Sequence, residues 1–117
     1  MKKFMKSCKY ALVGIKKAYR EQRNLKIMAV VSVVTLVLCI ILPVSYLDIA
    51  LILICNAACH SVELINTSVE HLCNHIHDGY HERIGVVKDI AAGATLVVVV
   101  VSGIVGCIVF VHSLLLQ

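Results

Sequence analysis

The chain has 117 residues, which leaves room for one domain. Hydrophobic residues make up 60% of it and charged residues 15%, with a formal net charge of +4. This balance excludes a soluble globular domain of the same size, whose surface would need more polar side chains. A bilayer accepts such apolar surface, so we predict an all-α integral membrane protein with a single domain over 1–117 and no nucleic-acid partner.

The first predicted element is an amphipathic helix over about 3–23 that lies on the membrane surface. Its apolar residues recur at three- and four-residue steps, namely Phe4, Met5, Cys8, Leu12, Ile15 and Tyr19. Lysines and Arg20 occupy the rest of the circumference, where they would meet anionic lipid. The alternative is a positively charged tail that only sets the topology.

Three apolar segments follow, and we predict that each spans the membrane. The first runs over about 27–42 and ends at Pro43. The second runs over about 47–77, and its last part extends into the cytoplasm. A polar loop over 78–85 leads to the third, over about 89–116.

The distribution of positive charge predicts the orientation. All eleven lysines and arginines lie between Lys2 and Lys26 or at Arg83 and Lys88. The turn at 43–48 and the C-terminus carry none. Because positively charged segments stay in the cytoplasm, the N-terminus is expected inside and the C-terminus outside.

A polar stripe runs along the second predicted span. At 100° per residue, six polar side chains share one face: Asn56, Glu63, Asn66, Thr67, Glu70 and Asn74. Glu63 falls inside the cytoplasmic edge of the hydrocarbon region, and Glu70 lies near its boundary. An ionisable group within a span is costly, so it indicates function. The alternative is that Glu63 only hydrogen-bonds a neighbouring helix.

The two carboxylates suit chemistry between a lipid headgroup and a water-soluble partner. Glu63, drawn toward low dielectric, suits a general base that acts on an alcohol. Glu70, near water, suits Mg²⁺, and Glu21 could add a second oxygen if the surface helix folds against the second span. Lys88 would complement phosphate charge. The sequence has no P-loop and no protein-kinase glycine-rich loop, so a nucleotide site here would have a different design.

Other functions are compatible with parts of this pattern. Four histidines lie within eleven residues, and the spacing of the first two is that of zinc ligands: His71, His75, His77 and His81. A transition-metal site is therefore one alternative. A small proton-coupled transporter that uses Glu63 is another, although that class typically has inverted repeats. A purely structural membrane peptide would not need the carboxylates.

Several motifs resemble those of the prokaryotic diacylglycerol kinase and undecaprenol kinase family. ELINTSVE covers 63–70, GYHE covers 79–82 and KDIAAGATL covers 88–96. AYREQRN, at 18–24, is similar to the surface-helix segment of that family. The resemblance extends over nearly the whole chain.

The resemblance implies a homotrimeric kinase of the bacterial cell membrane that transfers phosphate from MgATP to a lipid alcohol. It implies that Glu63 is the catalytic base, and that Glu21 and Glu70 hold Mg²⁺ and contact the nucleotide. The further nucleotide contacts that it implies are His81, Lys88 and Asp89. The supporting residues are Asn24, Asn66 and Asn74. Phosphoryl transfer mainly needs positioning and charge neutralisation, so a site this sparse is sufficient.

Two positions depart from the family pattern. Asn74 stands where the family usually has an aspartate, and Gly79 stands where an acidic residue commonly precedes Tyr-His. Both changes could weaken contacts with nucleotide or metal. The ELINTSVE and AAGATL segments look more like the undecaprenol kinase branch. Undecaprenol is therefore the expected acceptor, and diacylglycerol is the alternative.

Overall fold

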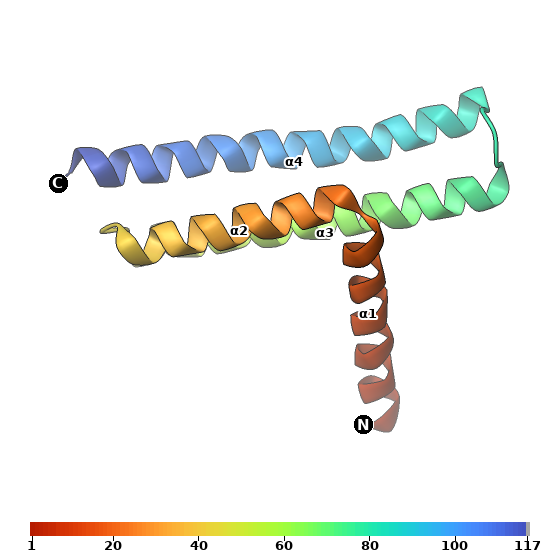
Figure 1. The fold of residues 1–117 in the computed structure, drawn as a ribbon, viewed down its shortest axis with the longest axis horizontal. Coiled ribbons are helices and arrows are strands. Elements are labelled where there is room, and N and C mark those ends of the chain that lie inside the picture. Colours follow the sequence, from red (N-terminus) through yellow and green to blue (C-terminus); the bar gives the residue numbers. More distant parts are fainter. Residues whose placement is uncertain (117) are drawn as a thin grey trace.

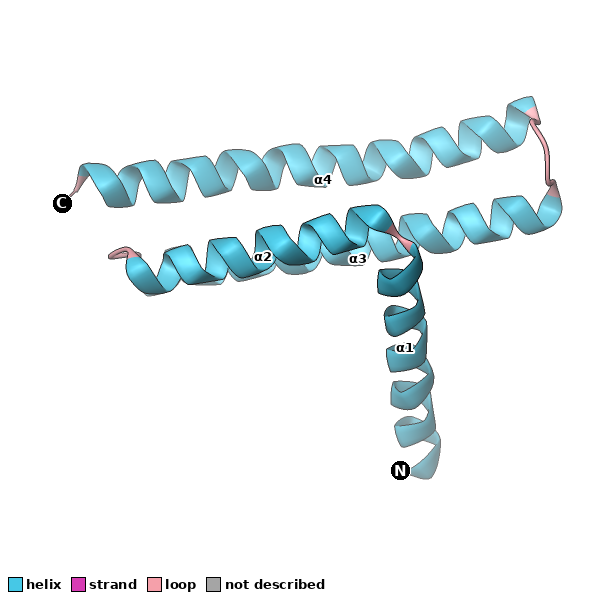
Figure 2. Ribbon diagram, in the orientation of Figure 1, coloured by secondary structure: helices cyan, strands magenta, loops and turns pink. Residues whose placement is uncertain are grey.

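The computed structural model describes residues 1–116, and these form four helices and no strand (Figure 1). The helices are α1 (Lys2–Glu21), α2 (Arg23–Ile41), α3 (Tyr46–Ile76) and α4 (Glu82–Leu115). The last three are long and apolar enough to cross a membrane. They run side by side, whereas α1 leaves the bundle across their direction (Figures 1 and 2). The all-α fold with three candidate spans is thereby confirmed.

A single residue turns the chain from α1 into α2. Gln22 has an extended backbone, with φ −98° and ψ 118°, and it separates the two helices. Its N–H still donates to Ala18 O at 2.8 Å, and its carbonyl accepts from Lys26 N at 3.3 Å. The bend therefore leaves no backbone group of Gln22 unpaired, although neither glycine nor proline is present.

The turn between α2 and α3 is set by local sequence. Leu42 is extended, as expected for a residue before proline, and this ends α2. The Ser45 hydroxyl oxygen then accepts a hydrogen bond from Asp48 N at 3.2 Å and donates one to Asp48 Oδ2 at 2.8 Å. An N-cap serine followed by an acidic residue in the first turn favours helix initiation at Tyr46.

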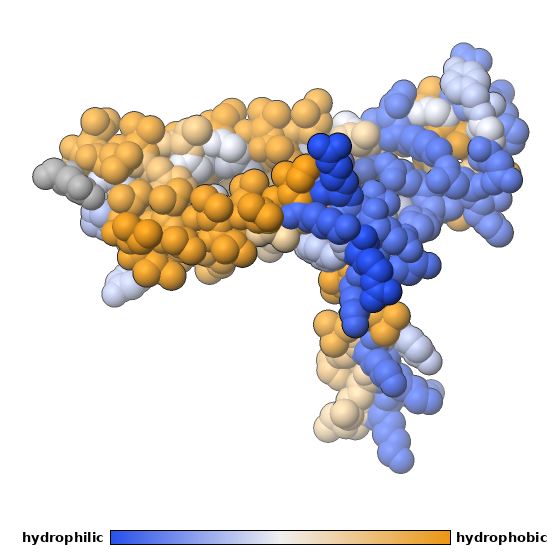
Figure 3. All heavy atoms as spheres, in the orientation of Figure 1, coloured by the Kyte–Doolittle hydropathy of each residue, from blue (hydrophilic) through white to orange (hydrophobic). Residues whose placement is uncertain are grey.

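α3 and α4 form an antiparallel pair joined by a short connection at 77–81. At about 1.5 Å per residue they extend roughly 46 Å and 51 Å, well beyond a hydrocarbon core of about 30 Å. Both helices therefore project from the membrane at the end where they are connected. The polar residues gather at this end (Figure 3).

α3 lies at the centre of the bundle, packed against α2 on one side and α4 on the other. A small apolar cluster of Cys39, Ile52 and Val109 joins the three helices at the end opposite the loop. Between α2 and α4 an open groove of about 830 Å³ runs along α3. Most other large apolar side chains are exposed, which suits a lipid environment.

The helices differ in extent from the predicted spans. α4 begins at Glu82, so the loop predicted over 78–85 is wrong at its C-terminal end. Lys88 and Asp89 consequently lie in the second turn of α4 and not at its start. Hydropathy locates the membrane-embedded part of a helix, whereas a helix continues beyond the membrane wherever its backbone hydrogen bonds can form.

Candidate active site

The middle of the polar face of α3 is buried. Glu63 is only 2% exposed, and Asn66 and Thr67 on the next turn are also buried. The two ends of this stripe have different neighbours. Asn56 is hydrogen-bonded to Ser32 and Thr35 on α2, whereas Asn74 Oδ1 lies 2.5 Å from Lys88 Nζ on α4. Cys59, beside the stripe, also contacts α4, with its Sγ 3.2 Å from Ser102 Oγ.

Two oxygens on this face have no hydrogen-bond partner within residues 1–116. They are Glu63 Oε2 and Asn66 Oδ1, and both are inaccessible to solvent. Thr67 donates its hydroxyl hydrogen to the Glu63 carbonyl at 2.9 Å, so it does not satisfy the carboxylate. A buried acceptor without a donor costs about 1–3 kcal/mol. Such a cost marks these two oxygens as candidate ligand contacts.

Glu70 lies one turn beyond Asn66 and is half-buried. The Asn66 side-chain amide donates to Glu70 Oε1 at 3.5 Å, at the long end of hydrogen-bond distances. The structure therefore brings Glu63, Asn66 and Glu70 together on one face, as the sequence predicts. The contact also gives Asn66 a physical means of orienting Glu70.

Glu21 approaches the same part of α3 from the end of α1. Its Oε2 lies 3.5 Å from His71 Nε2, and His71 directly follows Glu70 in the chain. Lys17, one turn earlier on α1, lies 4.0 Å from Glu21 Oε1. The Glu21 side chain remains 41% exposed, so it is open to a ligand from the aqueous side.

The other predicted site residues surround this region without contacting the carboxylates. Lys88 is paired with Asn74, an uncharged acceptor, so no carboxylate within residues 1–116 neutralises its ammonium group. His81 caps α4, and its ring meets that of His77 edge-on at 5.2 Å. Asp89 is exposed on α4. Asn24 lies in the first turn of α2, where it lines the groove between α2 and α4.

The donor set fits Mg²⁺ bound together with a phosphate ligand. Within residues 1–116, no three His, Cys, Asp or Glu side chains converge into a metal site. A transition metal would need three or four such ligands. Mg²⁺ needs only one or two carboxylates, with phosphate and water oxygens completing its shell. Glu21 and Glu70, which are both accessible carboxylates near one end of α3, meet that requirement.

The sequence analysis missed a polar cluster next to this face. His60 lies one turn before Glu63, and its ring contacts Tyr19 on α1 and Ser32 on α2. Tyr19 was assigned to the apolar stripe of the surface helix, and His60 was given no role. His60 and Ser32 lie within otherwise apolar spans, and such polar residues need hydrogen-bond partners in a membrane. Their presence in the sequence therefore indicates a polar contact between the two spans.

Comparison with known proteins agrees with the geometry. The family model for prokaryotic diacylglycerol kinase matches residues 9–110. The undecaprenol kinase of Bacillus subtilis (strain 168) is 32% identical over 114 residues, covering 97% of this chain and 93% of that protein. The diacylglycerol kinase of Synechocystis sp. (strain ATCC 27184 / PCC 6803 / Kazusa) is 30% identical over 101 residues, covering 86% of this chain but 58% of that protein.

The family match extends over most of the chain and includes α3 with its buried Glu63. Both relatives are named as kinases of lipid alcohols, which excludes the transporter and purely structural alternatives. The resemblance inferred from the motifs is confirmed. This chain is a membrane lipid kinase and belongs to the prokaryotic diacylglycerol kinase family.

Proposed function

We propose that the chain phosphorylates undecaprenol with MgATP at the cytoplasmic surface of the bacterial cell membrane. The observation that carries this proposal is Glu63, a buried carboxylate with one free oxygen on the face of α3 that continues to Glu70. The alignment with a protein named undecaprenol kinase over 97% of the chain supports the choice of lipid. Diacylglycerol is the second candidate, because the other relative carries that name.

Glu63 acts as the general base in the proposed reaction. The hydroxyl group of the lipid donates to the free Oε2 of Glu63, which takes its proton as the lipid oxygen bonds to the terminal phosphorus. The bond between that phosphorus and its bridging oxygen breaks, and ADP leaves. Asn66 Oδ1, the other free buried acceptor, lies one turn away and can accept a hydrogen bond from a substrate hydroxyl.

Charged residues of α1, α3 and α4 bind the nucleotide in this proposal. Glu21 and Glu70 hold Mg²⁺, which would neutralise charge on the phosphate oxygens when bound. Lys88 supplies a positive charge that its present partner, Asn74, does not neutralise. Asn66 keeps Glu70 oriented through their contact. His81 and Asp89 provide further nucleotide contacts at the aqueous end, and Asn24 supports the bend.

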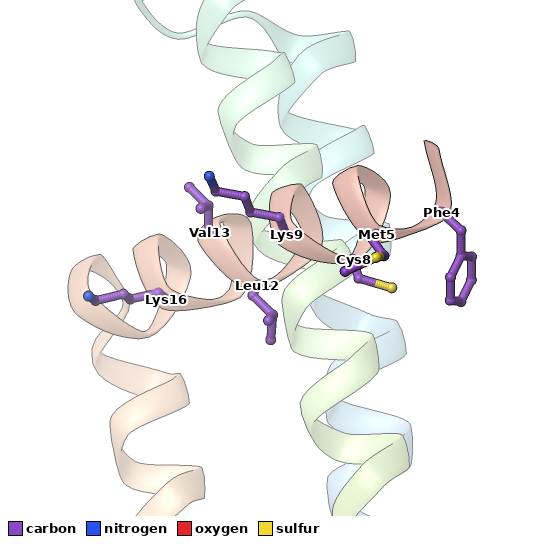
Figure 4. Close-up of a pocket in the computed structure, with 7 residues that line it drawn as sticks. All are labelled: Phe4, Met5, Cys8, Lys9, Leu12, Val13 and Lys16. Atoms are coloured by element: carbon purple, nitrogen blue, oxygen red, sulfur yellow. The ribbon is translucent and has the colours of Figure 1, made fainter. Parts of the chain in front are cut away.

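α1 lies on the cytoplasmic membrane surface in this proposal. Phe4, Cys8 and Leu12 point toward the side on which α2 continues, whereas Lys9 points away from it (Figure 4). In this proposal Phe4, Cys8 and Leu12 face the lipid and Lys9 faces the water, with Val13 on the same side as Lys9 (Figure 4). The nine lysines and arginines between Lys2 and Lys26, and Arg83 and Lys88 after the 77–81 connection, favour a cytoplasmic location for both regions. The N-terminus is then inside and the C-terminus outside.

The proposed assembly is a homotrimer. Gly103 and Gly106 line the open groove between α2 and α4, and a Cβ added at either would meet no atom within 4 Å. Small residues along a groove allow a helix of another copy to approach closely in lipid. The exposed apolar surface of the single chain offers further contact area.

The decisive experiment is a phosphorylation assay with purified protein in mixed micelles that contain Mg²⁺ and either undecaprenol or diacylglycerol. We expect ATP-dependent phosphorylation of both lipids to be measurable and undecaprenol to react at least tenfold faster at equal mole fraction.

Faster reaction with diacylglycerol would reassign the acceptor while leaving the kinase chemistry intact. No transfer to either lipid by folded, oligomeric protein would contradict the proposed function. Formation of phosphorylated lipid without an equal amount of ADP would also contradict it, because the phosphoryl group would then not come from ATP.

A further inference from the structure

His60 connects all three helices that meet at the bend. Its Nδ1 contacts the hydroxyl of Tyr19 on α1, and its Nε2 lies 2.8 Å from Ser32 Oγ on α2. The rings of Tyr19 and His60 also stack, with centroids 5.6 Å apart and planes inclined by 22°. One side chain of α3 therefore contacts both α1 and α2.

One arrangement of hydrogens satisfies every contact in this cluster. Ser32 donates its hydroxyl hydrogen to Asn56 Oδ1 at 3.1 Å, so Ser32 Oγ must accept from His60 Nε2–H. Asn56 Nδ2 donates to Thr35 Oγ1 at 3.2 Å, and Thr35 donates to the Ser32 carbonyl at 3.0 Å.

The same assignment leaves His60 Nδ1 as the acceptor of the Tyr19 O–H, with a neutral imidazole. Burial raises the pKa of the Tyr19 phenol above its ordinary value of 10.0, so the hydroxyl keeps its hydrogen at neutral pH. The fully paired cluster faces the apolar groove between α2 and α4. Hydrogen bonds in such surroundings rigidify the groups that they join.

The cluster lies close to the carboxylate that α1 contributes. Tyr19 precedes Glu21 by two residues, and α1 ends at Glu21. Two polar side-chain contacts join α1 to α3 within residues 1–116, Tyr19 to His60 and Glu21 to His71. On α3 these contacts bracket the segment that carries Glu63 and Glu70.

The two contacts differ in strength. Glu21 and His71 are 41% and 53% exposed, and exposed ion pairs contribute little to stability. Tyr19 and His60 are half-buried, stacked and hydrogen-bonded. The Tyr19–His60 contact is therefore the main side-chain link that keeps the end of α1 against α3.

We propose that His60 is a positioning residue of this kinase, which holds Glu21 against the part of α3 that carries Glu70 and His71 by fixing Tyr19 and the α1–α2 bend. The proposal rests on the proposed function in one respect, the binding of Mg²⁺ by Glu21. It predicts a selective effect, because loosening α1 displaces a metal ligand but leaves Glu63 and the lipid-facing part of α3 in place.

The test uses Tyr19→Phe, which removes one hydroxyl and keeps the ring. Tyr10→Phe is the matched control, since Tyr10 also lies on α1, is 70% exposed and has no hydrogen-bond partner within residues 1–116. We expect Tyr19→Phe to raise the Mg²⁺ concentration for half-maximal activity and the KM for MgATP by about 3- to 10-fold. The KM for the lipid and all constants of Tyr10→Phe should remain unchanged.

His60 is tested by two substitutions of different character. His60→Leu removes both hydrogen bonds, and we expect it to exceed Tyr19→Phe in its effect on the Mg²⁺ requirement. His60→Gln keeps a donor for Ser32, so we expect partial rescue. Equal effects of Leu and Gln would overturn the role assigned to the hydrogen bonds.

A second measurement does not depend on activity. Hydrogen–deuterium exchange of the wild type and variants in lipid nanodiscs reports on the backbone of residues 15–24. We expect exchange in this segment to be at least threefold faster than in the wild type for Tyr19→Phe and His60→Leu. The exchange rate of Tyr10→Phe should equal that of the wild type. Unchanged exchange in both variants would overturn the proposal.

Glu21→Gln distinguishes a failure of the positioning role of His60 from a failure of the proposed Mg²⁺ binding by Glu21. If this variant raises the Mg²⁺ requirement while Tyr19→Phe and His60→Leu do not, the positioning role of His60 is overturned. If none of the three changes the Mg²⁺ requirement but exchange accelerates, the metal role of Glu21 is overturned and the link between α1 and α3 stands.

Discussion

Glu63 combines three properties that rarely coincide in a membrane helix. It is ionisable, it is buried, and one of its carboxylate oxygens has no donor within residues 1–116. A carboxylate kept only for packing would be expected to have both oxygens satisfied, because unpaired buried acceptors are destabilising. In the proposed reaction, the hydroxyl group of the lipid becomes the hydrogen-bond donor that this oxygen lacks.

The substitution Glu63→Gln tests this explanation at the residue scale. Gln has nearly the same shape but cannot accept the proton, so we expect kcat to fall by about 10²- to 10⁴-fold. Size-exclusion chromatography in detergent should show an unchanged oligomer. Asp78→Asn, in the exposed connection between α3 and α4, is the control and should retain activity. Activity within tenfold of wild type in Glu63→Gln would exclude Glu63 as the base.

α3 is the element that organises the molecule. It is long enough to cross the membrane and still extend beyond it, so one helix carries both a buried and an accessible carboxylate. Seven residues separate Glu63 from Glu70, which returns the helix to the same face after about 10 Å.

Ser45 is the N-cap residue of α3, which begins at Tyr46. We expect Ser45→Ala to destabilise the fold by about 1 kcal/mol, since it removes the acceptor for Asp48 N and the partner of Asp48 Oδ2. The midpoint of SDS-induced unfolding, followed by circular dichroism, measures the change. Ser68→Ala is the control, because the exposed Ser68 hydroxyl only donates to the Ile65 carbonyl within the helix. Equal midpoints for the two variants would contradict a role for the cap.

The whole molecule is divided into an apolar zone and a hydrophilic zone. Apolar residues cover α2 and the adjoining parts of α3 and α4, while hydrophilic residues cover the connected ends of α3 and α4 and the junction of α1 with α2 (Figure 3). α1 leaves the bundle where the two zones meet (Figures 1 and 3). A kinase that transfers a phosphoryl group from a soluble nucleotide to a lipid alcohol needs its site at such a border.

The proposed topology can be tested on the intact chain in bacterial cells. Alkaline phosphatase is active only outside the cytoplasm, and green fluorescent protein exported in unfolded form is dark. We expect a C-terminal fusion to alkaline phosphatase to be active and a C-terminal fluorescent fusion to be dark. N-terminal fusions should give the opposite result, because nine lysines and arginines precede Met28. A fluorescent C-terminal fusion would reverse the predicted orientation.

The predictable part of the candidate site lies within α3. The helical period alone places Glu63, Asn66 and Glu70 on one face, and the structure confirms that they share it. The pairing of Lys88 with Asn74 was not predictable, since it depends on how the 77–81 connection aligns two helices. The length of that connection was itself overestimated, because polar residues do not by themselves end a helix.

By itself, the sequence determined the features that depend on composition and local spacing. These are the three apolar helices, the charge asymmetry, the polar face of α3 and the membership of the kinase family. Which residues of different helices contact each other depends on the tertiary structure. The contact of Tyr19 with His60 and the approach of Glu21 to His71 join residues that are 41 and 50 positions apart. Such contacts follow from the bend at Gln22 and the packing of α1 across α3, which no local pattern specifies.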